Sequence, residues 1–482
     1  PAAAANRQNN AAAQGDDDDL ANSEWQRGAI THTQKMREFT DADSGAQPTP
    51  PVIPAFSVDF DASGLVATDQ PGGATITASN PFFQNLGTNG RTCFTCHRPD
   101  EGWTVTPQSI AQRFQDSRGL DPIFRTNDGS TCAGADVSTL GKRRSAFSLL
   151  MSRGLIRVEI GTPPGAQFVI ESVDDPYRCG ASPASPSLFR RPLPATNLAF
   201  LSAVMWDGRE SSPSTTILQD LAQQADDATM GHAQASLHLT PQEAQAIVAF
   251  ETGMFTAQAR DNDAGSLSDG GATGGPRALV GQPFFIGIND PVGLNPSGAQ
   301  FDPRAFSVFD AWRDRDASPA RRAVARGQDL FNTLPIVISG VGGLNGVTFP
   351  SGVTVPDSFT GTCTTCHDAP NAGSHSVKAP LNIGLTDASR RTPDMPLYTL
   401  RRISTGETVQ TTDPGRAMTT GQWADIGKFK GPVLRGLAAR APYFHNGSAA
   451  TLEDAVEFYN SRFNLRLTAQ QKSDLAAFLR SL

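Results

Sequence analysis

Two five-residue stretches of the sequence share the spacing C-x-x-C-H, the first over residues 93–97 and the second over residues 363–367. In this pattern the two cysteines can form thioether bonds to a porphyrin, and the histidine can ligate its iron on one axial face. A single copy could also be a zinc or redox pair beside a chance histidine. Two copies among only six cysteines favour haem attachment, so we expect two covalently bound haem c groups. Their expected ligands are Cys93, Cys96, His97, Cys363, Cys366 and His367.

The second axial ligand of each iron decides between transport and catalysis, because a carrier closes the iron with Met or His whereas a catalyst leaves a position open. After His97 the next histidine is His232, and Met151 and Met205 are the only methionines before Met230. We therefore expect an open first iron, with ligation by Met151 as the alternative.

The second iron has more candidate ligands. Met418 has the separation from the haem motif that is typical of Met-ligated cytochromes, so spacing alone favours it. His375 follows His367 by only eight residues and would need a sharp chain reversal. The full set of candidates is His375, Met395, Met418, His445 and Tyr459.

The remaining two cysteines, Cys132 and Cys179, are expected to form one disulfide, because c-type haems are attached outside the cytosol. Two free buried thiols are the alternative. The chain starts at Pro1 without a recognisable signal peptide, as a mature or trimmed product would, and we expect a periplasmic or secreted protein. The sequence contains no run of 18 apolar residues, so we expect no membrane span. The net charge of -8 argues against nucleic acid as a partner.

The elements that must position the two haem motifs are expected to be mostly helical. Helical spacing marks residues 194–255 and 320–331, and capping boxes precede two helices at the end of the chain. Residues 1–54 are polar and Pro-rich, which indicates a tail or arm. Residues 55–300 are expected to form one cytochrome c-like domain with a disulfide-stapled insertion, and residues 301–482 a second. The predicted fold class is thus mainly α, with long loops and little β-structure.

Several segments resemble the bacterial di-haem cytochrome c peroxidases and MauG. Residues 429–437 (F-K-G-P-V-L-R-G-L), 441–447 (A-P-Y-F-H-N-G) and 451–456 (T-L-E-D-A-V) resemble the C-terminal signature of that superfamily. Residues 205–209 (M-W-D-G-R) resemble its tryptophan motif between the haems, and residues 413–416 (D-P-G-R) also fit. The matches lie in both expected domains and leave out the tail and the disulfide region.

The resemblance implies a different ligand for the second iron than spacing does. In these peroxidases the methionine ligand follows the histidine of the Pro-Tyr-Phe-His motif by fourteen residues, and the same count from His445 leads to Tyr459. MauG and its relative BthA are similar to this sequence in carrying tyrosine there. Tyr459 is then the implied ligand, and Met418 stays the alternative if Tyr459 is only a core residue. A phenolate would stabilise ferric and higher oxidation states.

The resemblance also implies residues for electron and proton transfer. Trp206 would be the relay between the haems, although a tryptophan in a core is the simpler explanation. The family's distal Gln-Ala…Pro…Glu pattern starts with Gln224, but Ala228 stands at the proline and Gln234 at the acid. Because glutamine cannot shuttle a proton, His232 is the first choice for acid–base help, ahead of nearby aspartates. The expected catalytic set is Trp206, Gln224, Asp227, His232 and Gln234, with Asp226 as a further candidate.

The superfamily also binds a calcium ion between its domains, through backbone carbonyls and one asparagine. The resemblance places the carbonyls at Arg440 and Pro442. The asparagine position falls near Pro192, so Asn197 would have to supply the side-chain ligand.

These features predict a peroxidase. Hydrogen peroxide would be reduced at an open N-terminal haem, which would share oxidising equivalents with a His/Tyr-ligated C-terminal haem. Electrons would return from a small redox protein, a cytochrome c or a cupredoxin, or from an oxidisable substrate. Two alternatives stay open. One is a di-haem dioxygenase resembling the latex-cleaving proteins, with residues 104–190 shaping an apolar channel; the other is a di-haem electron carrier with both irons six-coordinate.

Overall fold

The structure is a computed structural model that describes residues 48–179 and 186–482. The tail expected over residues 1–54 therefore falls almost entirely outside the described residues. Its last part contains strand β1 (Val52–Ile53), which pairs antiparallel with β4 (Thr75–Ile76). Within the described residues no helix is long and apolar enough to cross a membrane.

The helices begin where the sequence offers capping side chains. Thr216, Thr451 and Thr468 each form a capping box with the residue three positions later, which satisfies the free N–H groups of the first turn. The last two capping boxes confirm the prediction for the end of the chain. The helices are α2 (Pro107–Ser117), α3 (Leu140–Ala146), α4 (Ser148–Arg153), α5 (Ile217–Gly231), α6 (Pro241–Thr252), α7 (Arg277–Val280), α8 (Pro319–Thr333), α9 (Ala417–Thr420), α10 (Leu452–Arg462) and α11 (Ala469–Arg480).

Strands are more abundant than the sequence predicts. Helix accounts for 30% of the structure and strand for 17%, in five small sheets, so the prediction of a mainly α fold with little β-structure is wrong. The four-stranded sheet has the order β2 (Phe56–Asp61), β3 (Gly64–Asp69), β8 (Phe255–Asp261), β9 (Gly265–Ser266). The three-stranded sheet has the order β13 (Thr408–Thr411), β12 (Leu397–Arg402), β6 (Phe168–Asp174). The remaining sheets are pairs of strands: β1 with β4, β5 (Ile156–Glu159) with β7 (Ser187–Arg190), and β10 (Ile336–Ser339) with β11 (Ser358–Gly361).

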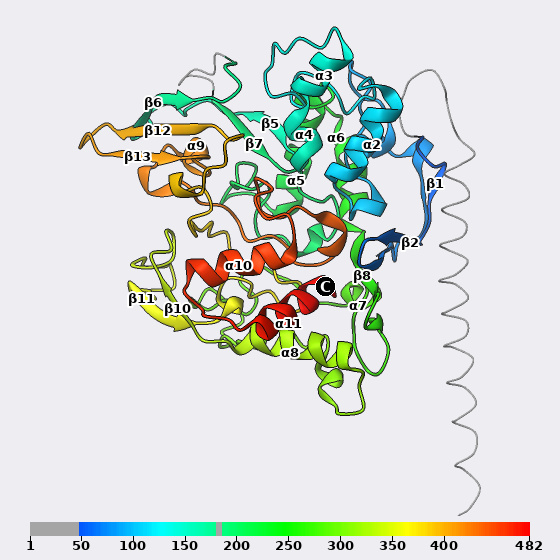
Figure 1. The fold of residues 1–482 in the computed structure, drawn as a ribbon, viewed down its shortest axis with the longest axis vertical. Coiled ribbons are helices and arrows are strands. Elements are labelled where there is room, and N and C mark those ends of the chain that lie inside the picture. Colours follow the sequence, from blue (N-terminus) through cyan, green and yellow to red (C-terminus); the bar gives the residue numbers. More distant parts are fainter. Residues whose placement is uncertain (1–47, 180–185) are drawn as a thin grey trace, which may run out of the picture.

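The physical reason for this error is visible in the three-stranded sheet. Strand β12 has only six residues, and its buried side chains alternate, as Tyr398 and Leu400 do. Such short alternations carry little signal in a sequence. The partner strand β6 lies more than 200 residues earlier, with Leu397 opposite Asp174, so the pairing exists only in the folded chain. Figure 1 shows the orange β12–β13 hairpin beside the teal β6.

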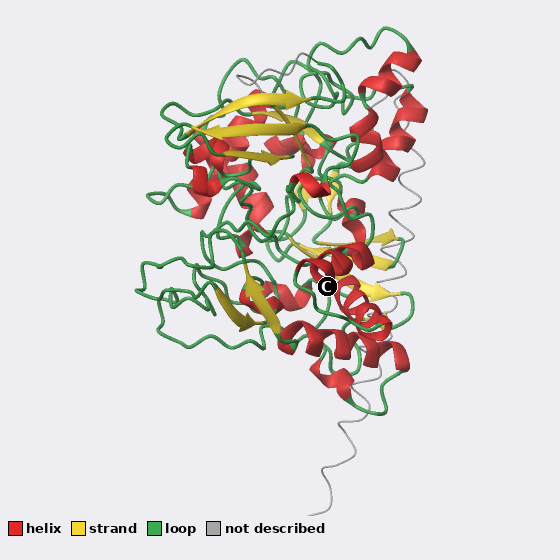
Figure 2. Ribbon diagram, turned by 60° about the vertical axis from the view of Figure 1, so that its left-hand side comes forward, coloured by secondary structure: helices red, strands yellow, loops and turns green. Residues whose placement is uncertain are grey.

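The C-terminal helices pack closely around the second haem motif. Helices α8, α10 and α11 lie together in the lower part of the molecule (Figures 1 and 2), and the ring of Phe331 on α8 packs at a tilt against that of Phe478 on α11, with 5.5 Å between ring centroids. The two helices touch at Gly327, where a Cβ would lie 2.0 Å from the carbonyl oxygen of Asp474. A larger side chain at position 327 would push α8 and α11 apart.

The region between α2 and β7 is cross-linked by one disulfide. The structure joins Cys132 to Cys179, with their Cα atoms 5.3 Å apart and a sequence separation of 47. The bond ties the loop before α3 to the chain that follows β6. The remaining four cysteines are all in the two C-x-x-C-H motifs.

Candidate functional site

Both C-x-x-C-H motifs fold in the same way. Each forms a single 3-10 turn, over Cys93–Thr95 and over Cys363–Thr365, with a threonine capping box. The turn directs the following histidine back into the fold, and the two histidines make equivalent hydrogen bonds. The distance from Nδ1 of His97 to the carbonyl oxygen of Trp103 is 2.9 Å, and that from Nδ1 of His367 to the carbonyl oxygen of Gly373 is 2.8 Å. A carbonyl can only accept, so Nδ1 carries the proton and Nε2 is free to ligate a metal.

Each motif lies in the wall of its own cavity. Cys93, Cys96 and His97 line the first cavity, and their counterparts in the second motif line the second. The first histidine lies beside the ring of Phe82, with 6.1 Å between the centroids of the phenyl and imidazole rings. The second histidine has Phe331 at 5.9 Å. Two sulfur atoms and an oriented imidazole at the edge of a largely apolar cavity are the donor set that fits a covalent haem.

The second cavity brings together some of the candidate axial ligands and separates others. Tyr459, His375 and His445 line it together with His367. Met395 and Met418 do not, because each is buried in a different hydrophobic cluster. Met395 packs with Leu149, Leu155 and Phe189, and Met418 packs with Phe168, Leu188, Tyr398 and Leu400. Helix α9 thus points Met418 at the three-stranded sheet, so the separation that favours it in the sequence does not bring it to the second cavity.

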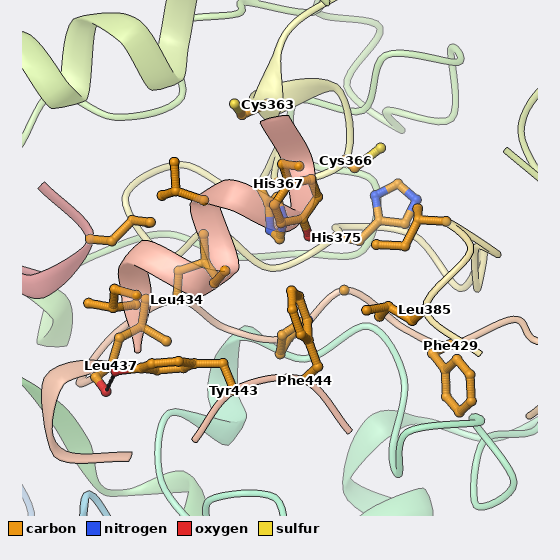
Figure 3. A pocket seen from close by; sticks show the side chains of 18 of the residues that line it. Cys363, Cys366, His367, His375, Leu385, Phe429, Leu434, Leu437, Tyr443 and Phe444 are labelled. Carbon is orange, nitrogen blue, oxygen red and sulfur yellow. Dashed lines mark hydrogen bonds between the residues drawn. The ribbon is translucent and has the colours of Figure 1, made fainter. Parts of the chain in front are cut away.

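Tyr459 comes from the face of α10 that borders this cavity. Its ring packs against Phe444, Phe458 and Phe463, and its hydroxyl makes no hydrogen bond to any described residue. Burial raises the pKa of the phenol, with the Cys366 and Cys363 thiols as smaller causes. Figure 3 shows Cys363, Cys366 and His367 on one side of this cavity, with Tyr443 and Phe444 on the opposite side.

The first cavity contains only part of the expected distal set. His232 and Gln224 line it, whereas Asp227 and Gln234 are exposed and do not. Gln234 lies after the end of α5 and contacts the side chain of Asn89 through a 3.4 Å hydrogen bond. Asp226 is also turned away, since it binds the ring of His238. Gln234, which stands where the family has its distal glutamate, is therefore a surface residue in this chain.

His232 is held by residues that the sequence did not indicate. Its Nδ1 lies 2.5 Å from Oδ2 of Asp128, and the other oxygen of Asp128 accepts from Arg91, also at 2.5 Å. Burial alone would raise the pKa of Asp128, but Arg91 and His232 outweigh it and lower that pKa. Because an ionised Asp128 accepts at Nδ1–H, Nε2 of His232 is left without a partner among the described residues. This is the arrangement of an oriented acid–base histidine.

Glu251 is a second protonatable group that sequence analysis missed. It lines the first cavity from α6, one helical turn after Ile247, and its Oε2 atom is buried without a hydrogen-bond partner. Burial raises the pKa of Glu251 to about 8. A charged residue on the buried face of an otherwise amphipathic helix is the only signal that could have revealed it. At neutral pH this carboxyl group is protonated and can donate a hydrogen bond into the cavity.

This burial predicts how stability changes with pH. The folded protein retains the Glu251 proton between pH 4.5 and about 8, where an exposed glutamate loses it, so the free energy of unfolding falls as the pH rises through that range. We expect Glu251→Gln to remove most of this fall, measured by urea unfolding of the holoprotein at several pH values. Glu407→Gln, on an exposed turn, is the matched control. Equal pH dependence in the wild type and Glu251→Gln would contradict the assignment.

Trp206 lies between the two cavities and lines both. Its Nε1–H donates to the carbonyl of Arg191 at 2.8 Å, and its ring meets that of His445 edge-on, with centroids 6.3 Å apart. His445 in turn stacks on Phe429 at 4.0 Å. The backbone N–H of Lys430 donates to the Trp206 carbonyl at 2.9 Å. The indole is therefore fixed at its ring nitrogen and at its backbone.

A buried ion network explains why two separate sequence motifs meet beside Trp206. The guanidinium of Arg190 binds Asp207 at 2.6 Å and both oxygens of Asp413 at 2.8 and 3.0 Å. All three side chains are almost fully buried. Burial by itself would lower the pKa of Arg190, but the two carboxylates raise it. Arg190 thereby joins the M-W-D-G-R motif to the D-P-G-R motif, and its removal would leave two buried carboxylates without the cation that they share.

Comparisons with known proteins agree with this arrangement of motifs. No family model matches the chain. The cytochrome-c peroxidase IdrP1 of Denitromonas iodatirespirans is 28% identical over 193 residues, which are 36% of this chain and 44% of that protein. Cytochrome c551 peroxidase of Nitrosomonas europaea is 44% identical over 69 residues, 14% of this chain and 21% of that protein. The matched parts thus span less than half of these relatives.

Two solved structures show a more distant likeness. A MauG-like protein associated with microbial copper homeostasis is 17% identical, with a TM-score of 0.37 and coverage of 84% of this chain and 86% of that one. A variant of the diheme peroxidase BthA from Burkholderia thailandensis is 16% identical, with a TM-score of 0.31 and coverage of 84% of both chains. The paired C-x-x-C-H motifs and the peroxidase relatives support the resemblance to the di-haem cytochrome c peroxidase and MauG superfamily.

Proposed function

We propose that the protein is a di-haem peroxidase that reduces hydrogen peroxide at a haem c in the first cavity. Cys93 and Cys96 would hold that haem by thioether bonds, and His97 would ligate its iron. The second haem would be held in the same way by Cys363, Cys366 and His367. The observation that carries this proposal is the position of Trp206 in the walls of both cavities, because it would give the two cofactors a shared aromatic neighbour.

When bound, the first haem iron supplies the position at which peroxide is coordinated and its O–O bond reduced. His232 takes a proton from the incoming peroxide at Nε2 and returns it to the departing oxygen, while Asp128 holds Nδ1–H and keeps the ring oriented. The protonated Glu251 adds a neutral hydrogen-bond donor to the same cavity. Gln224 offers a side-chain amide that can orient the substrate.

Trp206, which lines both cavities, would pass electrons between the cofactors bound there. Its Nε1–H is bonded to a backbone carbonyl, which is too weak a base to take the proton. The oxidised indole therefore keeps its proton, and electron transfer through it involves no proton movement. Tyr459 and His367 line the second cavity, and a haem bound there would have Tyr459 as its second protein ligand, which would favour oxidised states of the iron. Electrons return from a small redox protein, a cytochrome c or cupredoxin, or from an oxidisable substrate.

The location and domain organisation belong to the same proposal. Two cytochrome c-like haem units over residues 55–300 and 301–482 would act on either side of Trp206. The Cys132–Cys179 disulfide and the covalent haem motifs support action outside the cytosol, in the periplasm or as a secreted protein.

The decisive experiment is to add one equivalent of peroxide to the diferric holoprotein and follow both haems by absorption and electron paramagnetic resonance spectroscopy. A high-spin signal in the resting protein and its loss on peroxide addition are the expected results. If the resting protein shows only low-spin signals and peroxide changes neither haem, the protein is not a peroxidase.

That outcome would favour a di-haem electron carrier. One observation on the first cavity supports this second function. Met205 and His232 both line the first cavity and could close its iron. Met151, the ligand that the sequence suggests for closure, does not line it and packs instead beside Leu150 and Phe147.

Tyr459 provides a separate test at the second haem. Tyr459→Met is expected to raise the reduction potential of this haem, since a thioether favours Fe(II) and a phenolate favours Fe(III). Tyr459→Phe should leave the iron without a strong sixth ligand and convert its low-spin signal to high-spin. Tyr443 lines the same cavity, but its hydroxyl donates to the Leu437 carbonyl, so Tyr443→Phe serves as the control. Unchanged spectra in both Tyr459 variants would exclude Tyr459 as the ligand.

A further inference from the structure

Basic side chains gather in the wall shared by the two cavities. Three of them line both cavities: Arg191, Lys430 and Arg440. Each one donates hydrogen bonds to backbone carbonyls, and none forms an ion pair with a carboxylate of the described residues. A charge that is buried without a carboxylate is costly, so a function that needs it is expected at this position.

Arg191 lies in a cage of backbone oxygens. Its Nη1 donates to the carbonyl of Arg153 at 2.8 Å, and its Nη2 donates to those of Val105 at 2.7 Å and Arg440 at 3.2 Å. The side chain is 5% exposed. Gly154 leaves the space for it, since a Cβ there would lie 2.3 Å from Nη1. The three carbonyls come from segments up to 335 residues apart in the chain, so the guanidinium connects the N-terminal half to the segment before His445.

The same cage is where the resemblance predicts calcium. The carbonyl of Arg440 is one of the expected calcium ligands, but in this structure it accepts from Arg191. The expected side-chain ligand is also engaged. Oδ1 of Asn197 accepts from the Thr256 N–H at 3.0 Å, and its Nδ2 donates to the Thr256 carbonyl at 2.7 Å, which ties it to strand β8.

Two of the three oxygens expected to bind calcium therefore already accept hydrogen bonds, and the third is the carbonyl oxygen of Pro442. Ca²⁺ takes six to eight oxygen ligands, with carboxylates among them in most protein sites. Among the described residues no group of three or more His, Cys, Asp or Glu side chains could hold a metal ion. The residues expected to bind calcium thus do not fit the ion.

We propose that the guanidinium of Arg191 takes the place of the calcium ion and that this protein holds its two cavities together without a metal at this position. Burial lowers the pKa of Arg191 to about 10, with Glu101 opposing the shift and Arg440 adding to it, so the group is charged at neutral pH. A planar cation with five N–H donors can satisfy several carbonyls at fixed angles, which a calcium ion would do by coordination.

The first test uses the wild-type holoprotein. It is dialysed against EGTA, analysed for bound calcium by mass spectrometry, and then examined with and without added CaCl₂. We expect no stoichiometric calcium, the same resting electron paramagnetic resonance spectrum and the same thermal unfolding midpoint in all conditions. One calcium ion per chain after dialysis, or a spectral change that chelation causes and CaCl₂ reverses, would overturn the proposal.

The second test removes the guanidinium. Arg191→Met retains the length of the side chain but neither its charge nor its donors, and we expect its unfolding midpoint to fall by several degrees and its resting haem spectra to change. Arg191→Lys should show smaller changes. Arg401→Met should show none, because Arg401 lines neither cavity. An Arg191→Met holoprotein with the wild-type midpoint and spectra would overturn the proposal.

If Arg191→Met does not accumulate, the chelation experiment on the wild type decides. None of these measurements requires peroxide turnover. The result is therefore independent of whether the proposed peroxidase function is correct.

Discussion

Replacing His232 by glutamine is expected to lower kcat/KM for hydrogen peroxide by ~10²–10⁴-fold, the usual contribution of a positioned acid–base group. Glutamine retains a hydrogen-bonding side chain of similar reach but cannot accept a proton at the atom that corresponds to Nε2. The haem content and resting absorption spectrum should stay close to those of the wild type, since His232 does not belong to either C-x-x-C-H motif. Steady-state peroxide consumption and the rate of haem oxidation in stopped flow would measure the effect.

Two further variants make this result specific. Asp128→Asn removes the carboxylate that orients the imidazole, and we expect a loss of ~10–100-fold, the range found for partners that orient a functional histidine. Asp227 lies on the exposed side of α5, so the Asp227→Asn variant should be as active as the wild type. A larger loss for Asp227→Asn than for His232→Gln would return the acid–base role to the aspartate and contradict our assignment.

Replacing Trp206 by phenylalanine is expected to uncouple the two haems. The first haem should still react with peroxide, because Trp206 is not the acid–base group. The spectral change at the second haem should become at least tenfold slower, since a phenylalanine ring is much harder to oxidise and cannot serve as a relay. Double-mixing stopped flow with detection at wavelengths that separate the two haems would measure this difference.

Trp423→Phe is the matched control for this substitution. Trp423 is partly buried beside the cluster that contains Met418, and it lines neither cavity. Its replacement should leave both rates unchanged. If the second haem responds equally fast in Trp206→Phe and the wild type, electrons take another route. The position of Trp206 in both cavity walls would then no longer support the proposed function.

The sequence by itself determined the features that depend on a few neighbouring residues. The two C-x-x-C-H turns are local, since the spacing of the cysteines and the adjacent histidine needs no distant contact. The capping boxes at Thr451 and Thr468 are local as well, and both helices begin where they predict. The assignment to the superfamily rests on such short segments too, and the peroxidase relatives support it.

Pairings between distant segments were decided only by the tertiary structure. The five sheets unite short strands that have no clear signal alone, so the mainly α prediction was wrong. Met418 had the better spacing for a ligand, yet α9 turns it toward the three-stranded sheet, while α10 brings Tyr459 to the second cavity. The number of residues between the haem motif and a candidate ligand does not determine where the ligand's side chain points in the folded protein.

The surroundings of the polar side chains at the first cavity and at the shared wall were likewise decided by contacts between distant segments. Asp128 orients His232 from a position 104 residues earlier, and Glu251 is notable only because α6 buries it. Arg191 is one of many arginines in the sequence, and only the folded chain closes three carbonyls around it. Hydrogen bonds, burial and charge separation depend on distance between atoms, which the sequence alone does not specify.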